Sequence, residues 1–174
     1  SNMYLGNGIS PIVKFLNEGA TVGFGTDGAA SNNSQNMIET LKTGVLLQRV
    51  ANRDPQIICG RDAFYIATMG GAEALGMKDQ IGSLEVGKRA DIVLANFSEL
   101  TSSPCFNPIN TLVYSADSRC IKTVIIDGTV ILRNGEFVFV DEELVIRETQ
   151  AAGLALAKKA YNVDILKHAS SLRD

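Results

Sequence analysis

Residues 12–51 constrain the fold of this chain more than any other part of the sequence. They begin with an apolar helical stripe that follows a Ser-Pro pair and ends near Gly19, a residue type that often terminates helices. Residues 20–25 (ATVGFG) are short, apolar and partly β-branched, which is typical of a buried parallel strand. A polar loop and a long helix over roughly residues 35–51 follow. This order predicts an α/β unit whose polar loop lies at the carboxyl end of the strand, where such folds place their chemistry.

The remaining sequence predicts further helices and a β-meander. Residues 61–74 are rich in alanine and helical in pattern, but Gly70 and Gly71 interrupt them, so one helix and two short helices meeting at a kink are both open. Residues 98–108 are a polar, proline-bearing connection, and residues 142–160 predict a terminal helix. The predicted strands, separated in part by Asp-Gly and Asn-Gly turns, are 90–95, 120–126, 129–132 and 137–140.

These elements predict three parts. Residues 1–78 form an α/β part, residues 79–140 an antiparallel β part, and residues 141–174 a terminal helix and tail. Three or four strands with one apolar face need a partner sheet or a helix to cover them. We therefore expect the β part to depend on a further element for its stability.

Composition excludes several classes of function. A net charge of −3 and the lack of a long Lys/Arg cluster argue against a nucleic-acid partner. No apolar run approaches a membrane span, and the first residues do not resemble a signal peptide, so we expect a cytoplasmic protein without a membrane partner. The three cysteines, Cys59, Cys105 and Cys120, are widely spaced, which favours buried free thiols in a reducing compartment over a disulfide or a metal site.

The polar loop after residues 20–25 carries the candidate chemistry. Asp27 directly follows the predicted strand between two glycines, where a carboxylate can bind a metal ion or act as a general base. The alternative is a plain Asp-Gly turn, and the residues alone leave both interpretations open. Asn32, Asn33 or Ser34 can serve as the N-cap of the following helix.

Five segments of this sequence resemble motifs of the amidohydrolase superfamily, and together they extend over most of the chain. Within the superfamily, the resemblance is strongest to the branch of S-adenosylhomocysteine and methylthioadenosine deaminases, with triazine chlorohydrolases and guanine deaminase as relatives. One departure is Tyr4, where the family usually has lysine. The segments are residues 1–11 (SNMYLGNGISP), 25–33 (GTDGAASNN), 67–76 (ATMGGAEALG), 81–93 (IGSLEVGKRADIV) and 124–128 (VIIDG).

The resemblance implies a fold and a mechanism. The chain is expected to hold the last strands and helices of a (β/α)8 barrel, then part of a small β-sandwich and a C-terminal helix. Asp27 matches the aspartate that ligates a divalent metal, zinc or iron, and that takes a proton from the attacking water. Ser31 and Asn32 are candidate substrate-binding residues. The implied substrate is a small purine or nucleoside-like molecule whose C–N bond is hydrolysed.

The resemblance also implies metal-binding histidines that this sequence lacks. Its single histidine, His168, lies in a polar tail, where we expect an exposed residue without a catalytic role. A catalytic zinc needs about three protein ligands, so we expect that this chain alone binds no metal and is inactive. We expect the missing histidines in a segment before Ser1, and we favour Ser1-Asn2 as native residues over a vector-derived pair before Met3.

Two hypotheses about the whole protein follow. In the first, the chain is the C-terminal part of a complete deaminase and associates with the missing N-terminal part. In the second, the chain is a catalytically inactive stand-alone fragment or a self-associating module, which buries its open edges against a second copy as a homo-oligomer.

Overall fold

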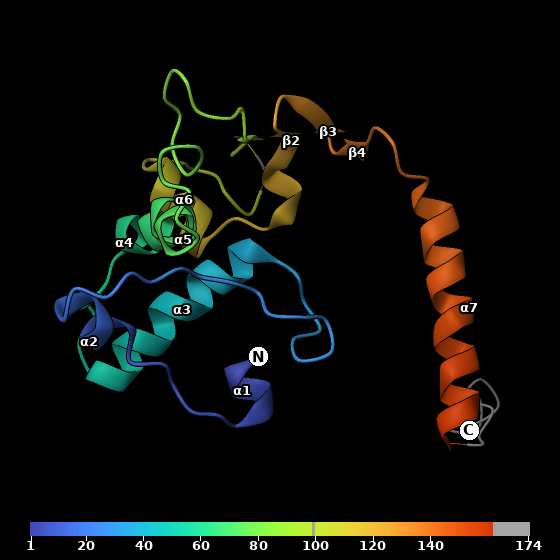
Figure 1. Ribbon diagram of the computed structural model, residues 1–174, viewed down its shortest axis with the longest axis horizontal. Helices are drawn as coiled ribbons and strands as arrows, with labels where there is room; N and C mark the ends of the chain where they lie inside the picture. Colours follow the sequence, from blue (N-terminus) through green and yellow to red (C-terminus); the bar gives the residue numbers. More distant parts are fainter. Residues whose placement is uncertain (99, 162–174) are drawn as a thin grey trace. The chain divides into compact units, whose positions relative to one another are not determined.

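The computed structural model describes residues 1–98 and 100–161, and it divides the chain into two units (Figure 1). The first unit is Ser1–Glu136 and the second is Phe137–Asp174. Each is described by itself below. The expectation for His168 falls outside the described residues.

Short helices around one long helix make up most of the first unit (Figure 1). The long helix α3 begins one residue after Asn36, whose Oδ1 accepts hydrogen bonds from the amides of Ile38 at 3.0 Å and Glu39 at 3.4 Å. The predicted N-cap at residues 32–34 is therefore wrong, because the loop continues for two residues before the helix starts. The helices are α1 (Asn2–Leu5), α2 (Ile12–Asn17), α3 (Met37–Asn52), α4 (Gly60–Tyr65), the π-helix η1 (Ile66–Gly70), α5 (Gly71–Ala74), α6 (Pro108–Tyr114) and the 3-10 helix η2 (Ser118–Cys120).

The hydrophobic core lies where α2, α3, α4, η1 and α6 meet. Partly buried side chains, Val22 and Phe24 among them, pack against this core from the loops. Leu46 of α3 lies outside this core and is 44% exposed. The buried members of the core are Ile12, Leu41, Val45, Ile58, Ala63, Ile66 and Val113.

Residues 20–25, predicted as a buried parallel strand, are extended but belong to no sheet in the described part of the chain. Val22 and Phe24 are half-buried, whereas the four residues beside and between them are exposed. A strand needs a hydrogen-bonded neighbour on at least one edge, and the described residues supply none here. The prediction of a buried strand is therefore wrong, although its side chains alternate as they do in a strand.

The glycine pair at residues 70–71 marks the end of a π-helical turn. The helix that starts at Gly60 widens into η1 over Ile66–Gly70 and resumes as α5 at Gly71. Of the two open alternatives, the structure therefore favours one continuous helical stretch with a π-helical turn. A Cβ added to Gly70 would lie 2.4 Å from the carbonyl oxygen of Val22. Glycine at position 70 thus allows η1 to approach the backbone of the extended segment closely.

Arg49 of α3 forms hydrogen bonds with two other parts of the first unit. Its guanidinium donates to the carbonyl oxygen of Ile58 at 3.1 and 3.2 Å and to the hydroxyl of Tyr114 at 2.8 Å, and it lies 5.3 Å from the centre of the Tyr114 ring. Arg49 is half-buried. If Arg49 is substituted, water can therefore replace its hydrogen bonds only in part.

Arg49→Met should lower the free energy of unfolding by about 1–3 kcal/mol, because it leaves the Ile58 carbonyl without its donors. Arg49→Lys should recover only part of that loss, since an ammonium lacks the planar fork of the guanidinium. Urea unfolding followed by circular dichroism measures both. Equal stability of Arg49→Met and the parent would contradict this account.

The described residues contain a sheet with strand order β1-β2-β3-β4, in which β1 and β2 pair antiparallel, as do β2 and β3. Its strands are β1 (Ile92–Ala95), β2 (Ile121–Ile126), β3 (Thr129–Arg133) and β4 (Glu136–Phe137). Ile92 pairs with Ile125 across β1 and β2, and Asp127-Gly128 makes the turn into β3. The β-meander is thus confirmed, except that the last predicted strand, 137–140, contributes only Phe137 to β4.

Two further features differ from expectation. Helix α6 lies in a stretch for which no element was predicted, and it is capped by Asn107, whose Oδ1 accepts from the Asn110 amide at 3.0 Å. All three cysteines are free, but only Cys120 is buried, whereas Cys59 and Cys105 are exposed. Their expected burial is wrong for these two, because Cys59 precedes the first turn of α4 and Cys105 lies in an irregular connection.

Asp117 and Arg119 form a tight local ion pair at η2, with Nη2 and Oδ2 2.7 Å apart. Hydrogen bonds from the Arg119 side chain and then its amide lower the pKa of Asp117 from 3.8 to about 2. A carboxyl group whose pKa is lower in the folded than in the unfolded protein stabilises the fold at pH values above its unfolded pKa. That stabilisation is lost as the pH falls through the folded pKa. Carboxyl NMR titration should therefore give an Asp117 midpoint near 2, moving toward 3.8 in Arg119→Leu; an ordinary midpoint in the parent would contradict the pair.

In the second unit, the structure describes residues 137–161, and helix α7 (Glu142–Tyr161) lies close to the predicted range. Asp141 precedes it, and its Oδ1 accepts from the Leu144 amide at 2.9 Å, as expected for an N-cap. Among the described residues, no helix is long and apolar enough to span a bilayer.

Candidate functional site

The candidate site is the loop between the extended residues 20–25 and helix α3. Asp27 has a left-handed backbone, with φ of 64°, which non-glycine residues adopt rarely and at a cost of about 1–2 kcal/mol. Its side chain is exposed, and its Oδ1 accepts from the Gly28 amide at 2.7 Å. The loop therefore presents a carboxylate to solvent on a backbone turn that needs support from its neighbours.

The surroundings of Asp27 favour its charged form. The hydrogen bond from the Gly28 amide lowers the pKa of Asp27, and a hydrogen bond with Ser1 lowers it further. Burial opposes these effects only weakly because the carboxylate is exposed. Asp27 is thus an ionised group at neutral pH, which is what a cation ligand requires. The bond also brings together the first and second of the motif segments, residues 1–11 and 25–33.

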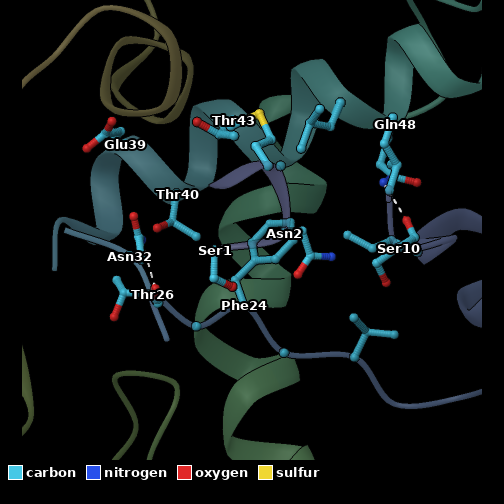
Figure 2. Close-up of a pocket in the computed structure, with 18 of the residues that line it drawn as sticks. Ser1, Asn2, Ser10, Phe24, Thr26, Asn32, Glu39, Thr40, Thr43 and Gln48 are labelled. Atoms are coloured by element: carbon cyan, nitrogen blue, oxygen red, sulfur yellow. Dashed lines mark hydrogen bonds between the residues drawn. The ribbon is translucent and has the colours of Figure 1, made fainter. Parts of the chain in front are cut away.

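Side chains from the loop itself bind its backbone. The Nδ2 of Asn32 donates to the carbonyl oxygen of Thr26 at 2.8 Å (Figure 2). The Nε2 of Gln35 donates to the carbonyl oxygen of Asp27 at 2.9 Å, and Gln35 Oε1 accepts from the Thr26 hydroxyl at 3.3 Å. The Ser31 amide donates to the carbonyl oxygen of Gly28 at 3.0 Å. These bonds close the loop into a compact turn around Asp27.

A cleft of about 630 Å³ lies beside this loop. Figure 2 shows Phe24, Thr26 and Asn32 on one side and Thr40, Thr43 and Gln48 of α3 on another, with Ser1 and Asn2 beside them. Asn32 lines this cleft, whereas Asp27 and Ser31 are not among its lining residues. The substrate-binding roles predicted for Ser31 and Asn32 stay predictions.

The described residues fit a metal ion only in part. The Asp27 carboxylate is exposed and ionised, and it can give a cation one oxygen ligand. Within residues 1–98 and 100–161, no three His, Cys, Asp or Glu side chains are grouped closely enough to hold a metal ion. A metal at Asp27 therefore requires ligands from outside this part of the chain.

An ionised carboxylate that follows an extended apolar segment and precedes a helix resembles the arrangement found in the active-site loops of α/β barrels. The match to family models is more specific. Residues 1–131 match the model of the Amidohydrolase family, a TIM-barrel superfamily, and the chain belongs to this family. The resemblance found in the motifs is thereby confirmed. Which barrel strands and helices these residues form stays a prediction.

Two curated relatives show how much of such a protein the chain represents. It is 48% identical over 150 residues to a 5-methylthioadenosine/S-adenosylhomocysteine deaminase of Desulforudis audaxviator, with 86% of this chain and 35% of the relative covered. It is 40% identical over 160 residues to a 5'-deoxyadenosine deaminase of Methanosarcina acetivorans, with 92% and 37% covered. The chain thus spans about a third of the length of the curated relatives it matches.

Solved structures agree with these relatives. An adenosine deaminase from Xanthomonas campestris with bound zinc matches with a TM-score of 0.83 at 31% identity, over 86% of this chain and 34% of that one. An atrazine chlorohydrolase from Arthrobacter aurescens complexed with zinc matches with a TM-score of 0.79 at 33% identity, over 86% and 33%. Both deaminases and chlorohydrolases are therefore among the proteins this chain is similar to.

Proposed function

We propose that this chain is the C-terminal third of a metal-dependent deaminase that acts on an adenosine-type nucleoside in the cytoplasm. The observation that carries the proposal is the ionised, exposed Asp27, held on a left-handed turn beside Ser1, in a family whose matched structures contain zinc. Deamination is favoured over dechlorination because the curated deaminases are 48% and 40% identical to the chain, against 33% for the atrazine chlorohydrolase.

In this mechanism, Asp27 has two tasks. A bound divalent cation supplies acidity to a water molecule at the site. With the cation bound, one oxygen of the Asp27 carboxylate would serve as a ligand. The carboxylate would also accept the proton of the water that attacks the ring carbon, and this proton would pass on to the departing amine. The exocyclic amine leaves that carbon as ammonia, so water and aminopurine become ammonia and oxopurine. Ser31 and Asn32 are proposed to contact the substrate from the same loop.

A chimera tests this function. The chain replaces the matching C-terminal third of the Desulforudis audaxviator deaminase, which supplies the rest of the fold. We expect zinc-dependent ammonia release from methylthioadenosine, S-adenosylhomocysteine or 5'-deoxyadenosine. Chloride release from atrazine without ammonia release would favour the chlorohydrolase alternative. A folded chimera without either activity would contradict the proposed function and favour a stand-alone fragment.

A further inference from the structure

We propose that Gln35 is a positioning residue for the proposed reaction: it holds the Asp27 backbone in the conformation that presents the carboxylate to the metal. This inference rests on the proposed function. Gln35 precedes α3 by two residues and is separated from Asp27 by eight positions in sequence. It is the side chain through which the far end of the loop contacts the backbone of Asp27.

The backbone of Asp27 is strained. With φ of 64°, Asp27 is in a region where an L-residue is strained, and such residues persist when their surroundings fix them. The bond from the Gly28 amide to the Asp27 carboxylate orients the side chain, yet it adds no support from outside the turn. The loop therefore needs a contact from a more distant residue to favour this backbone over the extended alternative.

Gln35 provides that contact with both ends of its amide. Its Nε2 donates to the carbonyl oxygen of Asp27 at 2.9 Å and to that of Asn32 at 3.3 Å. The Thr26 hydroxyl lies 3.3 Å from Gln35 Oε1 and 3.2 Å from the carbonyl oxygen of Asp27, and its single proton is shared between these two acceptors. One side chain thus joins the start, the turn and the later part of the loop.

The residues on either side of Gln35 are hydrogen-bonded to helix α3. Asn36 caps α3 through its Oδ1, and the Ser34 hydroxyl donates to Glu39 of α3 at 2.7 Å and accepts from the Asn36 amide at 3.2 Å. The backbone around Gln35 is therefore fixed to a helix whose Leu41 and Val45 lie in the core. Through Gln35, this helix determines where the Asp27 carbonyl lies. Removal of a partner that hydrogen-bonds a metal-ligating side chain typically changes metal affinity about 10-fold to 100-fold. Gln35 holds the backbone of the ligand, so we expect an effect at the lower end of that range.

Gln35→Met in the chimera tests the proposal, since methionine keeps the length of glutamine and removes its donors. We expect the zinc dissociation constant, measured by chelator competition, to rise about 10-fold. The control is Gln56→Met, which alters an exposed glutamine in another loop and should leave zinc binding unchanged. Gln35→Lys, which restores a donor of similar reach, should recover part of the affinity. Unchanged zinc affinity in Gln35→Met would overturn the proposal.

A second measurement uses the 174-residue chain without metal. The amides of Ser31 and Asn32 donate to the Gly28 carbonyl within the loop, so their hydrogen exchange reports whether the turn is held. Gln35→Met should speed exchange at both amides and leave the midpoint of thermal unfolding nearly unchanged. Equal exchange in Gln35→Met and parent would overturn the proposal. If the parent chimera binds no zinc while these amides respond as expected, the proposed function fails and the role of Gln35 in the loop stands.

Discussion

Asp27→Asn in the deaminase chimera should reduce turnover by about 10³-fold or more, at a zinc concentration that saturates the parent. Asparagine keeps the size of the side chain but removes the charge that binds the cation and the oxygen that accepts the proton of water. General acid–base contributions alone are typically 10²-fold to 10⁴-fold, and the loss of a metal ligand adds to them. Steady-state ammonia release with methylthioadenosine measures the effect.

The control is Asp79→Asn, which makes the same chemical change at an exposed carboxylate between α5 and β1. It should keep the turnover of the parent within about twofold, because surface substitutions away from special features have small effects. Turnover of Asp27→Asn near that of the control would show that Asp27 is a turn residue without a part in the chemistry.

Gly70→Ala should lower the free energy of unfolding by about 1–3 kcal/mol through overpacking. The new methyl carbon would lie 2.4 Å from the carbonyl oxygen of Val22, which is backbone and cannot turn aside. The extended residues 20–25 would have to move away from η1. Asp27 lies two residues further along the chain, so it would be displaced as well. Loss of zinc affinity should accompany the loss of stability.

Gly71→Ala is the matched control. The nearest atom to its added methyl carbon is the carbonyl oxygen of Ile66, at an ordinary 3.9 Å, and Gly71 has helical φ of −62°. Alanine there should be neutral or stabilise by up to about 1 kcal/mol, through its higher helix propensity. Thermal unfolding of both variants separates a specific contact from a general sensitivity of the π-helical turn. Equal destabilisation by the two alanines would contradict the proposed contact.

The parts of the fold that follow from local signals could be predicted from the sequence. The hairpin turn at Asp127-Gly128 needs only its own residues, and both strands beside it formed where expected. These features depend on contacts within a few residues, which one sequence contains in full.

The structure of residues 20–25 could not be predicted from local signals. Their composition is that of a strand, but a parallel strand exists only beside hydrogen-bonded neighbours, and the described residues provide none. The first helical residue after the loop was misplaced for a related reason. Several polar residues in succession can all cap a helix, and the choice of Asn36 depends on how the loop before it closes.

The candidate site was predicted in part. Asp27 stands out because it lies between glycines after an apolar run, and its role follows from the motif around it. Gln35 carries no such signal, since its partners are the backbone carbonyls of Asp27 and Asn32, and backbone atoms leave no trace in a sequence. The bond between Asp27 and Ser1 joins residues 26 positions apart and likewise depends on the fold.

Anomalous diffraction at the zinc edge tests whether Asp27 binds the metal of a deaminase. In crystals of the zinc-loaded chimera, we predict an anomalous peak with an Asp27 carboxylate oxygen about 2.0–2.2 Å away, the normal distance for such a ligand. The other ligands should come from the part of the chimera outside this chain. A zinc peak surrounded by those ligands, with the Asp27 carboxylate beyond coordinating distance, would contradict the claim.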